Sequence, residues 1–172
     1  MTTLEELVAR VSELERRLSA SEAVLALHRL KAHYGQLVDQ RFAFGAVVDP
    51  ATLATVATAI AELFSADGVW DGGPGLGRAA GRDAIAARLG DPTLTFSRHF
   101  FVNPRLEVTG PRATGRWEVL CPCRRPDGTS YWMCGYEDDV YERIDDRWLY
   151  RSMTLTSVFM APVNDGWTRI LV

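Results

Sequence analysis

The sequence predicts an α+β fold in which long helices come first and a curved antiparallel sheet follows. Before Pro92, apolar residues recur mainly three and four positions apart, as on one face of a helix. After Pro92, apolar and polar residues alternate over four long segments that end at tight turns. Segregation of helices and strands along the chain is typical of the α+β class. The sheet can wrap around the helices as an open cone, leaving a pocket of Trp, Tyr, Phe and Met side chains for a small molecule.

The composition narrows the class of protein. A chain of 172 residues fits one domain with an appendage, and its net charge of −3 gives no sign of a nucleic-acid or anionic-membrane partner. No apolar run approaches the roughly 20 residues that cross a bilayer, and the charged N-terminus does not resemble a signal peptide. Three cysteines, an odd number, argue against a disulfide framework. We therefore expect a cytoplasmic protein without a nucleic-acid or membrane partner.

The first segment has a heptad pattern. Apolar side chains fill the a and d positions of about three heptads, with Ser21 in one of them: Leu4, Leu7, Val11, Leu14, Leu18 and Leu25. Two interpretations remain open, a long amphipathic helix that packs on its own domain and a short coiled coil between subunits. We divide the chain into a helical extension (1–22), a main domain (23–162) and a C-terminal tail (163–172).

The helix is expected to continue beyond the heptads. Its apolar residues keep spacings of three and four: Leu27, Leu30, Tyr34 and Leu37. Asp39 lies nine residues after Leu30, about 180° around an ideal helix. Asp39 can therefore face the same cavity as Tyr34 only if the helix bends or ends near Val38, and Gly35 allows a bend.

A second helix and a glycine-rich segment follow. Asp49-Pro50 is a good helix start, with Asp as N-cap and Pro in the first turn. Asp67-Gly68 ends that helix, and a short strand begins at residue 69. The segment 72–81 loosely matches a dinucleotide fingerprint, but no βαβ unit surrounds it and no acidic residue follows at the required distance. We therefore predict no cofactor and a short helix over 83–89.

The strand region carries the one histidine that stands out. Strands are predicted over 96–108, 112–124, 130–143 and 148–159. His99 lies near the start of the first, between an arginine and two phenylalanines. If this strand lines a closed cavity, His99 is the most basic group there near neutral pH. Taken alone, a histidine of this kind is more often a structural residue of the core.

Several short motifs together resemble one family. They are Tyr34 with Asp39, LFSADGVW at 63–70, GRDAI at 81–85, Arg98-His99 with Asn103, and YERIDDRW at 141–148. In order and spacing they resemble the NTF2-like superfamily over about residues 23–162. The nearest branch is SnoaL-like, which includes scytalone dehydratase, bile-acid 7α-dehydratase and hexachlorocyclohexane dehydrochlorinase. This resemblance implies a cone-shaped α+β barrel and a homo-oligomer, either a trimer or a dimer.

The resemblance also implies roles for individual residues. In the dehydratase-like members an aspartate of the first helix region pairs with a strand histidine, and Asp39 and His99 match these positions. Tyr34 matches a tyrosine that takes part in the bile-acid enzymes. Arg151 is the nearest candidate for an arginine of the last strand, although it can equally form a plain ion pair. If Arg151 points inward, Met153 should do so too.

One position departs from the bile-acid enzymes. They carry a second aspartate on the strand after the histidine, where Cys121 falls here, which is closer to the dehydrochlorinases. We expect Cys121 to line the substrate pocket together with Trp70, Phe101 and Met153. No metal site is expected, because a site built on Cys121 and Cys123 needs further ligands and only one more cysteine is available.

The acidic run 137–139 has two interpretations. The first is a solvated strand edge. The second is an inward Asp138 that acts as a second acid.

The chemistry that these residues support is proton abstraction. A carboxylate on one imidazole nitrogen fixes the tautomer, so that the other nitrogen can take a proton. Tyr34 could donate a hydrogen bond to a carbonyl or departing hydroxyl, and Arg151 could stabilise anionic charge. We therefore expect a cofactor-independent lyase or isomerase that acts on a small apolar or polycyclic substrate. The alternatives are a polyketide-cyclase-like enzyme of the same fold and a non-catalytic small-molecule-binding or assembly protein.

Overall fold

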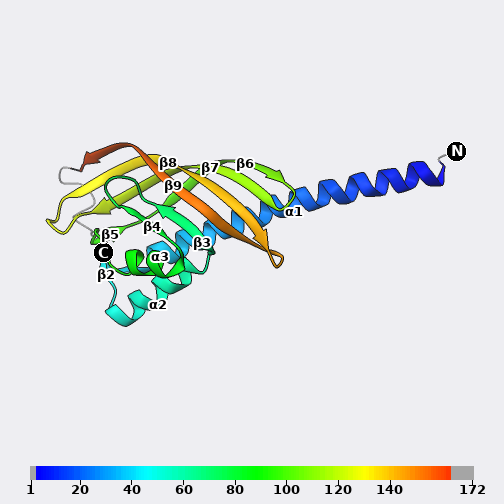
Figure 1. Cartoon of the computed structure of the whole chain (residues 1–172). Helices are drawn as coiled ribbons and strands as arrows, with labels where there is room; N and C mark the ends of the chain where they lie inside the picture. Colours follow the sequence, from blue (N-terminus) through cyan, green and yellow to red (C-terminus); the bar gives the residue numbers. More distant parts are fainter. Residues whose placement is uncertain (1–2, 164–172) are drawn as a thin grey trace.

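The computed structural model describes residues 3–163 and confirms an α+β fold with the helices first and the sheet after. Figure 1 shows the arrangement. The elements in chain order are α1 (Leu4–Gln40), β1 (Phe42–Ala43), β2 (Ala46–Val47), α2 (Pro50–Ala61), β3 (Phe64–Asp71), β4 (Arg78–Ala80), α3 (Arg82–Leu89), β5 (Phe96–Ser97), β6 (Phe100–Thr109), β7 (Arg112–Arg124), β8 (Ser130–Ile144) and β9 (Arg147–Pro162). Most of the predicted tail lies outside the described residues. No helix within residues 3–163 is long and apolar enough to cross a membrane.

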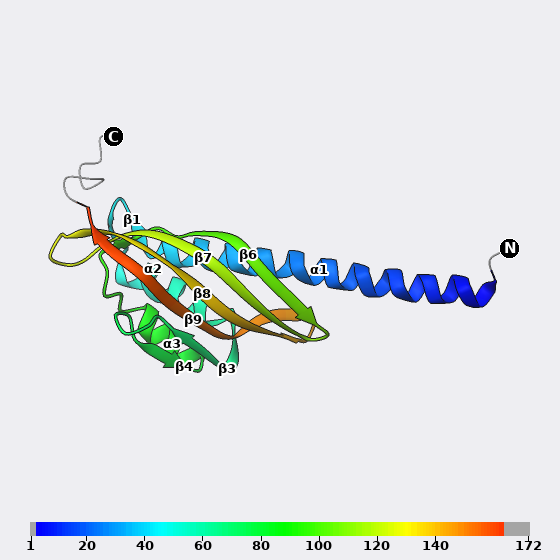
Figure 2. The ribbon, with the colours of Figure 1, turned by 90° about the horizontal axis from the view of Figure 1, so that it is seen from above.

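Helix α1 is one long element with two different halves. A capping box fixes its start, since the Thr3 side chain accepts a hydrogen bond from the Glu6 backbone and the Glu6 side chain accepts one from the Thr3 backbone. Residues 3–22 are all exposed, and Ala23 is the first buried residue. The exposed half projects from the body of the molecule as a straight arm, while the other half lies under the sheet (Figures 1 and 2).

The sheet curves over the buried half of α1 (Figure 2). Its strands follow the order β4-β3-β9-β8-β7-β5, and β6 pairs with the same edge of β7 as β5. All pairings are antiparallel except that of β3 with β9. The main core lies between the concave face of the sheet and helices α1, α2 and α3. The last turn of α1 lies next to Arg98 and His99, and this region is called the mouth of the cone below.

A β-bulge in β9 turns Arg151 outward. Tyr150 pairs with Tyr141 and Ser152 pairs with Val140, so Arg151 is an extra residue without a partner in this register. Tyr150 and Met153 are buried, although simple alternation would place them on opposite faces. Arg151 instead forms an ion pair with Asp67 on the surface.

The predicted strand over 96–108 is broken at Arg98 and His99, which lie between β5 and β6. The register against β7 is the same on both sides of the break, with Ser97 opposite Cys123 and Phe100 opposite Leu120. In a regular strand two neighbouring side chains point to opposite faces. The break removes this constraint, so Arg98 and His99 can both turn to the end of α1.

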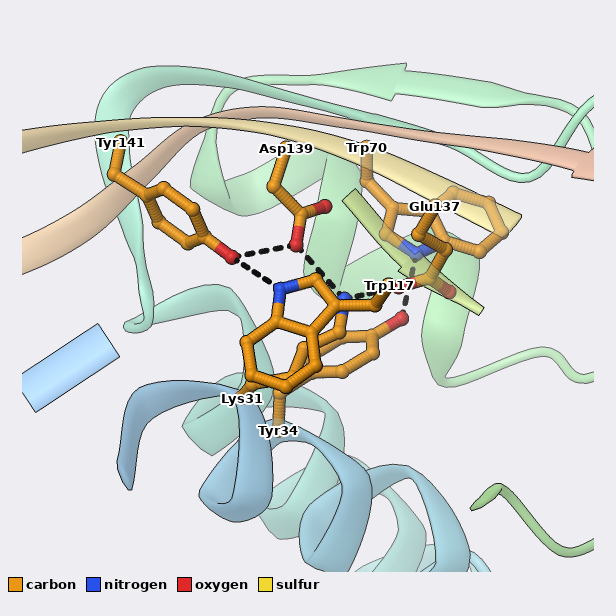
Figure 3. Close-up of polar contacts among 7 residues, drawn as sticks. All are labelled: Lys31, Tyr34, Trp70, Trp117, Glu137, Asp139 and Tyr141. Atoms are coloured by element: carbon orange, nitrogen blue, oxygen red, sulfur yellow. Dashed lines mark hydrogen bonds and ion pairs between the residues drawn. The ribbon is translucent and has the colours of Figure 1, made fainter. Parts of the chain in front are cut away.

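A cluster of buried charges fills the interior of the cone (Figure 3). The Lys31 ammonium group, 1% exposed, donates hydrogen bonds to Glu137 and, at 2.9 Å, to Asp139. The Tyr141 hydroxyl donates to the same Asp139 oxygen at 2.6 Å, and the Trp117 indole donates to Tyr141 at 3.0 Å. Because Glu137 and Asp139 lie on the inward face of β8, the expected solvated edge is wrong for these two residues.

Asp138 points the other way. Its carboxylate forms a two-bond ion pair with Arg116, at 2.7 and 2.8 Å, and both side chains are partly exposed. The alternative of an inward Asp138 is therefore wrong as well. Strand alternation explains both outcomes, since residues 137 and 139 share one face of β8 and residue 138 has the other.

Candidate active site

The structure brings Asp39 and His99 into direct contact at the mouth of the cone. The Asp39 Oδ1 atom lies 2.9 Å from His99 Nδ1 and also accepts a hydrogen bond of 3.0 Å from the His99 backbone N–H. The other carboxylate oxygen of Asp39 lies 3.3 Å from Arg98 Nε. Two hydrogen bonds and one ion pair thus hold one buried carboxylate in a single orientation. Since a carboxylate can only accept, His99 Nδ1 is the donor in this contact, and in a neutral imidazole the lone pair is then on Nε2.

Asp39 reaches His99 without a bend at Gly35. Helix α1 runs unbroken to Gln40, so Asp39 lies in its last turn. Its side chain faces a different side of the helix from Tyr34, as their spacing of five residues requires. Gly35 instead allows a close approach, because a Cβ atom there would lie 3.3 Å from the Phe101 ring.

Phe101 links the two polar groups of this region. Its ring stacks on His99, with centroids 5.8 Å apart and planes at 16°. The Lys31 Nζ atom lies 4.4 Å from the centroid of the same ring. Phe101 therefore stands between the buried charge cluster and the histidine and shields one from the other.

Two hollows meet at His99. The outer one is open, has a volume of about 420 Å³ and is lined by Gly35, Asp39, Phe42, Arg98, His99 and Phe101 among others. The inner one has only about 40 Å³ of free space and is lined by Arg41, Phe42, Trp70, Ser97 and His99 among others. His99 and Phe42 line both hollows, so the two hollows adjoin at these side chains.

Tyr34 is not part of either hollow. Its side chain is buried, and its hydroxyl accepts a hydrogen bond of 3.0 Å from the Trp70 indole (Figure 3). The Phe101 ring packs against Tyr34, with centroids 6.1 Å apart, and lies between Tyr34 and His99. Burial raises the pKa of the Tyr34 hydroxyl far above its ordinary value. Tyr34 thus orients Trp70, and direct contact with a substrate beside His99 is not available to it.

The other predicted site residues divide into two groups. Trp70 lines the inner hollow and Phe101 the outer one. Cys121 and Met153 line neither, because both are packed in the core. Arg151 was expected in the site but lies outside it, because the bulge in β9 directs its side chain to Asp67 on the surface.

Asp39 and His99 together are called the dyad below. Three residues beside the dyad were not predicted from the sequence: Arg41, Ser97 and Arg98. Arg98 and Ser97 directly precede His99, and Arg41 follows Asp39 by two residues. Their proximity in sequence to the dyad is a signal that could have been used. Arg41 was obscured because an arginine after a helix end usually has a solvated side chain.

A family model described as a SnoaL-like domain matches residues 19–154. This range begins near the point where α1 becomes buried and ends within β9. A search of the curated proteins found no match.

Solved structures with the same fold span most of the chain. A hexachlorocyclohexane dehydrochlorinase, LinA type 2, has a TM-score of 0.71 and 20% identity and covers 86% of this chain and 93% of its own. A protein of Novosphingobium aromaticivorans, provisionally assigned as a scytalone dehydratase, has a TM-score of 0.66 and 20% identity, covering 84% and 90%. An NTF2-like protein with a cystatin-like fold from the same organism has a TM-score of 0.61 and 25% identity, covering 92% of each chain.

Proposed function

The chain belongs to the SnoaL-like domain family, and we propose that it is a cofactor-independent lyase or isomerase whose general base is His99. The observation that carries the proposal is the contact of 2.9 Å between Asp39 Oδ1 and His99 Nδ1, beside two hollows. A neutral histidine held in this way has the lone pair of Nε2 available for a proton. Asp39 stabilises the imidazolium that forms.

The reaction begins with removal of a proton from a carbon next to an activating carbonyl group. The proton passes to His99 Nε2, and the electron pair of the C–H bond becomes a new C=C bond as the carbonyl becomes an enolate. In an elimination, the enolate re-forms the carbonyl and expels a leaving group from the β carbon. In an isomerisation, His99 returns the proton to another carbon. Both reactions regenerate neutral His99. In the elimination this happens when the proton on Nε2 passes to the departing group or to water.

The outer hollow supports a substrate with an apolar, planar part. Phe42 and Phe101 contribute aromatic rings to its lining, and Gly35 contributes to the helix side. The names of two structural neighbours, a dehydrochlorinase and a provisional dehydratase, support elimination as the reaction type. The protein is therefore proposed to act on a small molecule whose reacting carbon lies beside His99 Nε2.

A screen of β-hydroxy and β-chloro carbonyl compounds, with variants of the dyad, tests this proposal. Asp39→Asn should keep the fold and lose about a hundredfold or more of the activity, because an amide stabilises an imidazolium poorly. His99→Ala should lose as much, and the double variant should be little worse than either single one. His33→Ala is the matched control, because His33 is an exposed histidine of α1, the helix that carries Asp39. Full activity in His99→Ala would reject the assignment of the base.

A non-catalytic small-molecule binder is the second candidate. The observation that favours it is the charge cluster around Lys31, which fills the interior where a deep substrate pocket would otherwise lie. A ligand that binds with the same affinity to the parent and to His99→Ala, without turnover in either, would favour this candidate.

A further inference from the structure

The inner hollow contains a buried cation without a carboxylate partner. Arg41 is 9% exposed, and no carboxylate oxygen within residues 3–163 lies within 4 Å of its guanidinium. Its Nε donates to the Val38 carbonyl at 3.0 Å, and Nη1 donates to the Leu89 carbonyl over a long 3.4 Å. Nη2 has no acceptor in the part of the chain that the structure describes. Burial lowers the pKa of Arg41, as expected for a cation removed from water.

A buried hydroxyl without a partner lies in the same hollow. Ser97 is 1% exposed, and its hydroxyl has no hydrogen-bond partner among the described residues. A buried hydroxyl without a partner is costly and calls for an explanation. Arg41, Ser97 and His99 all line this hollow, Arg88 adds a second guanidinium, and no Asp or Glu of the described chain lines it. Two cations and a free hydroxyl without an acid attract a negative group.

We propose that Arg41 and Ser97 form an oxyanion subsite beside His99. It would hold the carbonyl or carboxylate oxygen of a substrate while His99 removes a proton from the neighbouring carbon. The free space of about 40 Å³ admits one or two atoms, so the rest of the substrate would occupy the outer hollow. When the C–H electron pair moves to form the enolate, the new negative charge lies on the oxygen that Arg41 and Ser97 contact. This inference rests on the proposed function and gives Arg41 the task that the sequence suggested for Arg151.

Calorimetric titration with acetate and benzoate tests the subsite without any turnover. Ser97→Ala should weaken the binding of both carboxylates about tenfold, as for the loss of a hydrogen bond to a charged group. Arg41→Gln should weaken it further. Ser130→Ala removes another buried hydroxyl without a partner, one that does not line the hollow, and is the matched control with unchanged affinity.

Two results would overturn the subsite: no saturable binding of either carboxylate to the parent protein, or equal affinity in Ser97→Ala and the parent. Ser97→Ala keeps this test valid if Arg41→Gln fails to fold, since Arg41 also contacts the ends of α1 and α3. If the parent protein binds these carboxylates but shows no lyase or isomerase activity in the substrate screen, the result would support the subsite and reject the proposed function. The two failures are therefore distinguishable.

A different observation concerns the exposed arm of α1. Its apolar stripe consists of side chains that are each at least 47% exposed: Leu4, Leu7, Val11, Leu14, Leu18 and Leu25. A stripe of this length on an arm that projects from the domain is unusual for a surface that faces water (Figure 1). The stripe occupies a and d positions, so its natural partner is another helix of the same kind.

The charges beside the stripe identify that partner and its direction. Arg10 and Arg17 occupy g positions, and Glu15 and Glu22 occupy e positions. None of the four forms an ion pair with another described residue of its own chain, whereas Arg16 on the outer face pairs with Glu13 at 2.7 Å. In a parallel pair of these helices, each g residue meets the e residue five positions on in the partner, which joins Arg to Glu both times. In an antiparallel pair, Arg meets Arg and Glu meets Glu.

We infer that the arm forms a parallel, in-register coiled coil with the arm of a second copy of this chain. Sedimentation of two charge variants tests the inference. Glu15→Arg with Glu22→Arg, and Arg10→Glu with Arg17→Glu, should each lose association through the arm by like-charge repulsion, while an equimolar mixture should regain it. Exchange of the outer pair, Glu13→Arg with Arg16→Glu, is the matched control and should associate as the parent does.

Oxidative cross-linking tests the direction. Leu7→Cys should form a disulfide between two copies, because a parallel register places the two Cys side chains opposite each other. Ala9→Cys, on the outer face of the same turn region, should not. A parent protein that is monomeric at about 10 µM would overturn the inference, as would cross-linking in Ala9→Cys alone or charge variants that associate as tightly as the parent.

Discussion

At the scale of single residues, the position of a charge decides what it can do. Asp39 and Asp139 are both buried carboxylates, but they have different partners. Asp39 contacts a histidine beside two hollows, so its environment can respond to a substrate. Asp139 is enclosed by Lys31 and Tyr141 in the interior, so its contribution is to stability. The same residue type thus has a chemical task at the mouth of the cone and a structural one inside.

The pH dependence of stability should report on Asp139. Burial raises the pKa of its carboxyl group from 3.8 to about 6, with the Glu137 carboxylate adding to the effect and Lys31 opposing it. A pKa raised in the folded state gives a contribution that is present below about pH 4 and is lost as the pH rises through about 6. In Asp139→Asn the free energy of unfolding should therefore not show this loss between pH 4 and 7.

Chemical denaturation at several pH values checks this prediction. Asp138→Asn is the matched control, because that carboxylate lies on the outward face of the same strand and pairs with Arg116. Identical curves for the parent and Asp139→Asn would contradict the assignment. Lys31→Met should be more harmful than Asp139→Asn. It should lower the free energy of unfolding by roughly 3–5 kcal/mol, because it leaves two carboxylates buried together.

At the scale of elements, the contact between α1 and β6 sets the geometry of the site. Ala at position 35 would favour the helix by about 1 kcal/mol, but its methyl group would lie 3.3 Å from the Phe101 ring. Phe101 borders the open hollow, so its ring can shift by a few tenths of an ångström. We expect Gly35→Ala to change the free energy of unfolding by less than about 1 kcal/mol and to lower activity, since Phe101 stacks on His99.

Thermal unfolding and the activity identified by the substrate screen check this prediction. Adding Phe101→Leu to Gly35→Ala gives the control for the ring, because it removes the crowded atoms. An unchanged rate in Gly35→Ala would show that the position of the Phe101 ring is not important for His99.

The sequence predicts elements better than it predicts interruptions. The order of helices and strands follows from periodicity, and the positions of Asp39 and His99 follow from the family resemblance. The bulge at Arg151 and the break at Arg98 could not be predicted, because each depends on pairing with a neighbouring strand, which the local sequence does not give. Lys31 was missed for a related reason. A lysine next to an apolar helix face is normally solvated, and only the fold brings two acids of β8 to it.

At the scale of the whole molecule, the arm and the domain should be separable. Residues 3–22 bury no side chain, and the family match begins at residue 19. We expect a chain that begins at residue 19 to unfold within a few degrees of the parent and to lose association through the arm. Calorimetry and sedimentation check both parts. A large drop in Tm would mean that the arm stabilises its own domain instead.

The continuity of α1 has a consequence for how the arm becomes helical. A free peptide of the arm would have to form its first turn unaided, at a nucleation constant of about 10⁻³. In the intact chain the buried half of α1 already supplies that first turn, so each residue of the arm only extends an existing helix. The folded domain is therefore a template for the arm. Two such arms would meet as preformed helices, and the entropy of ordering their backbones would be lost during folding of each chain and not at the moment of encounter.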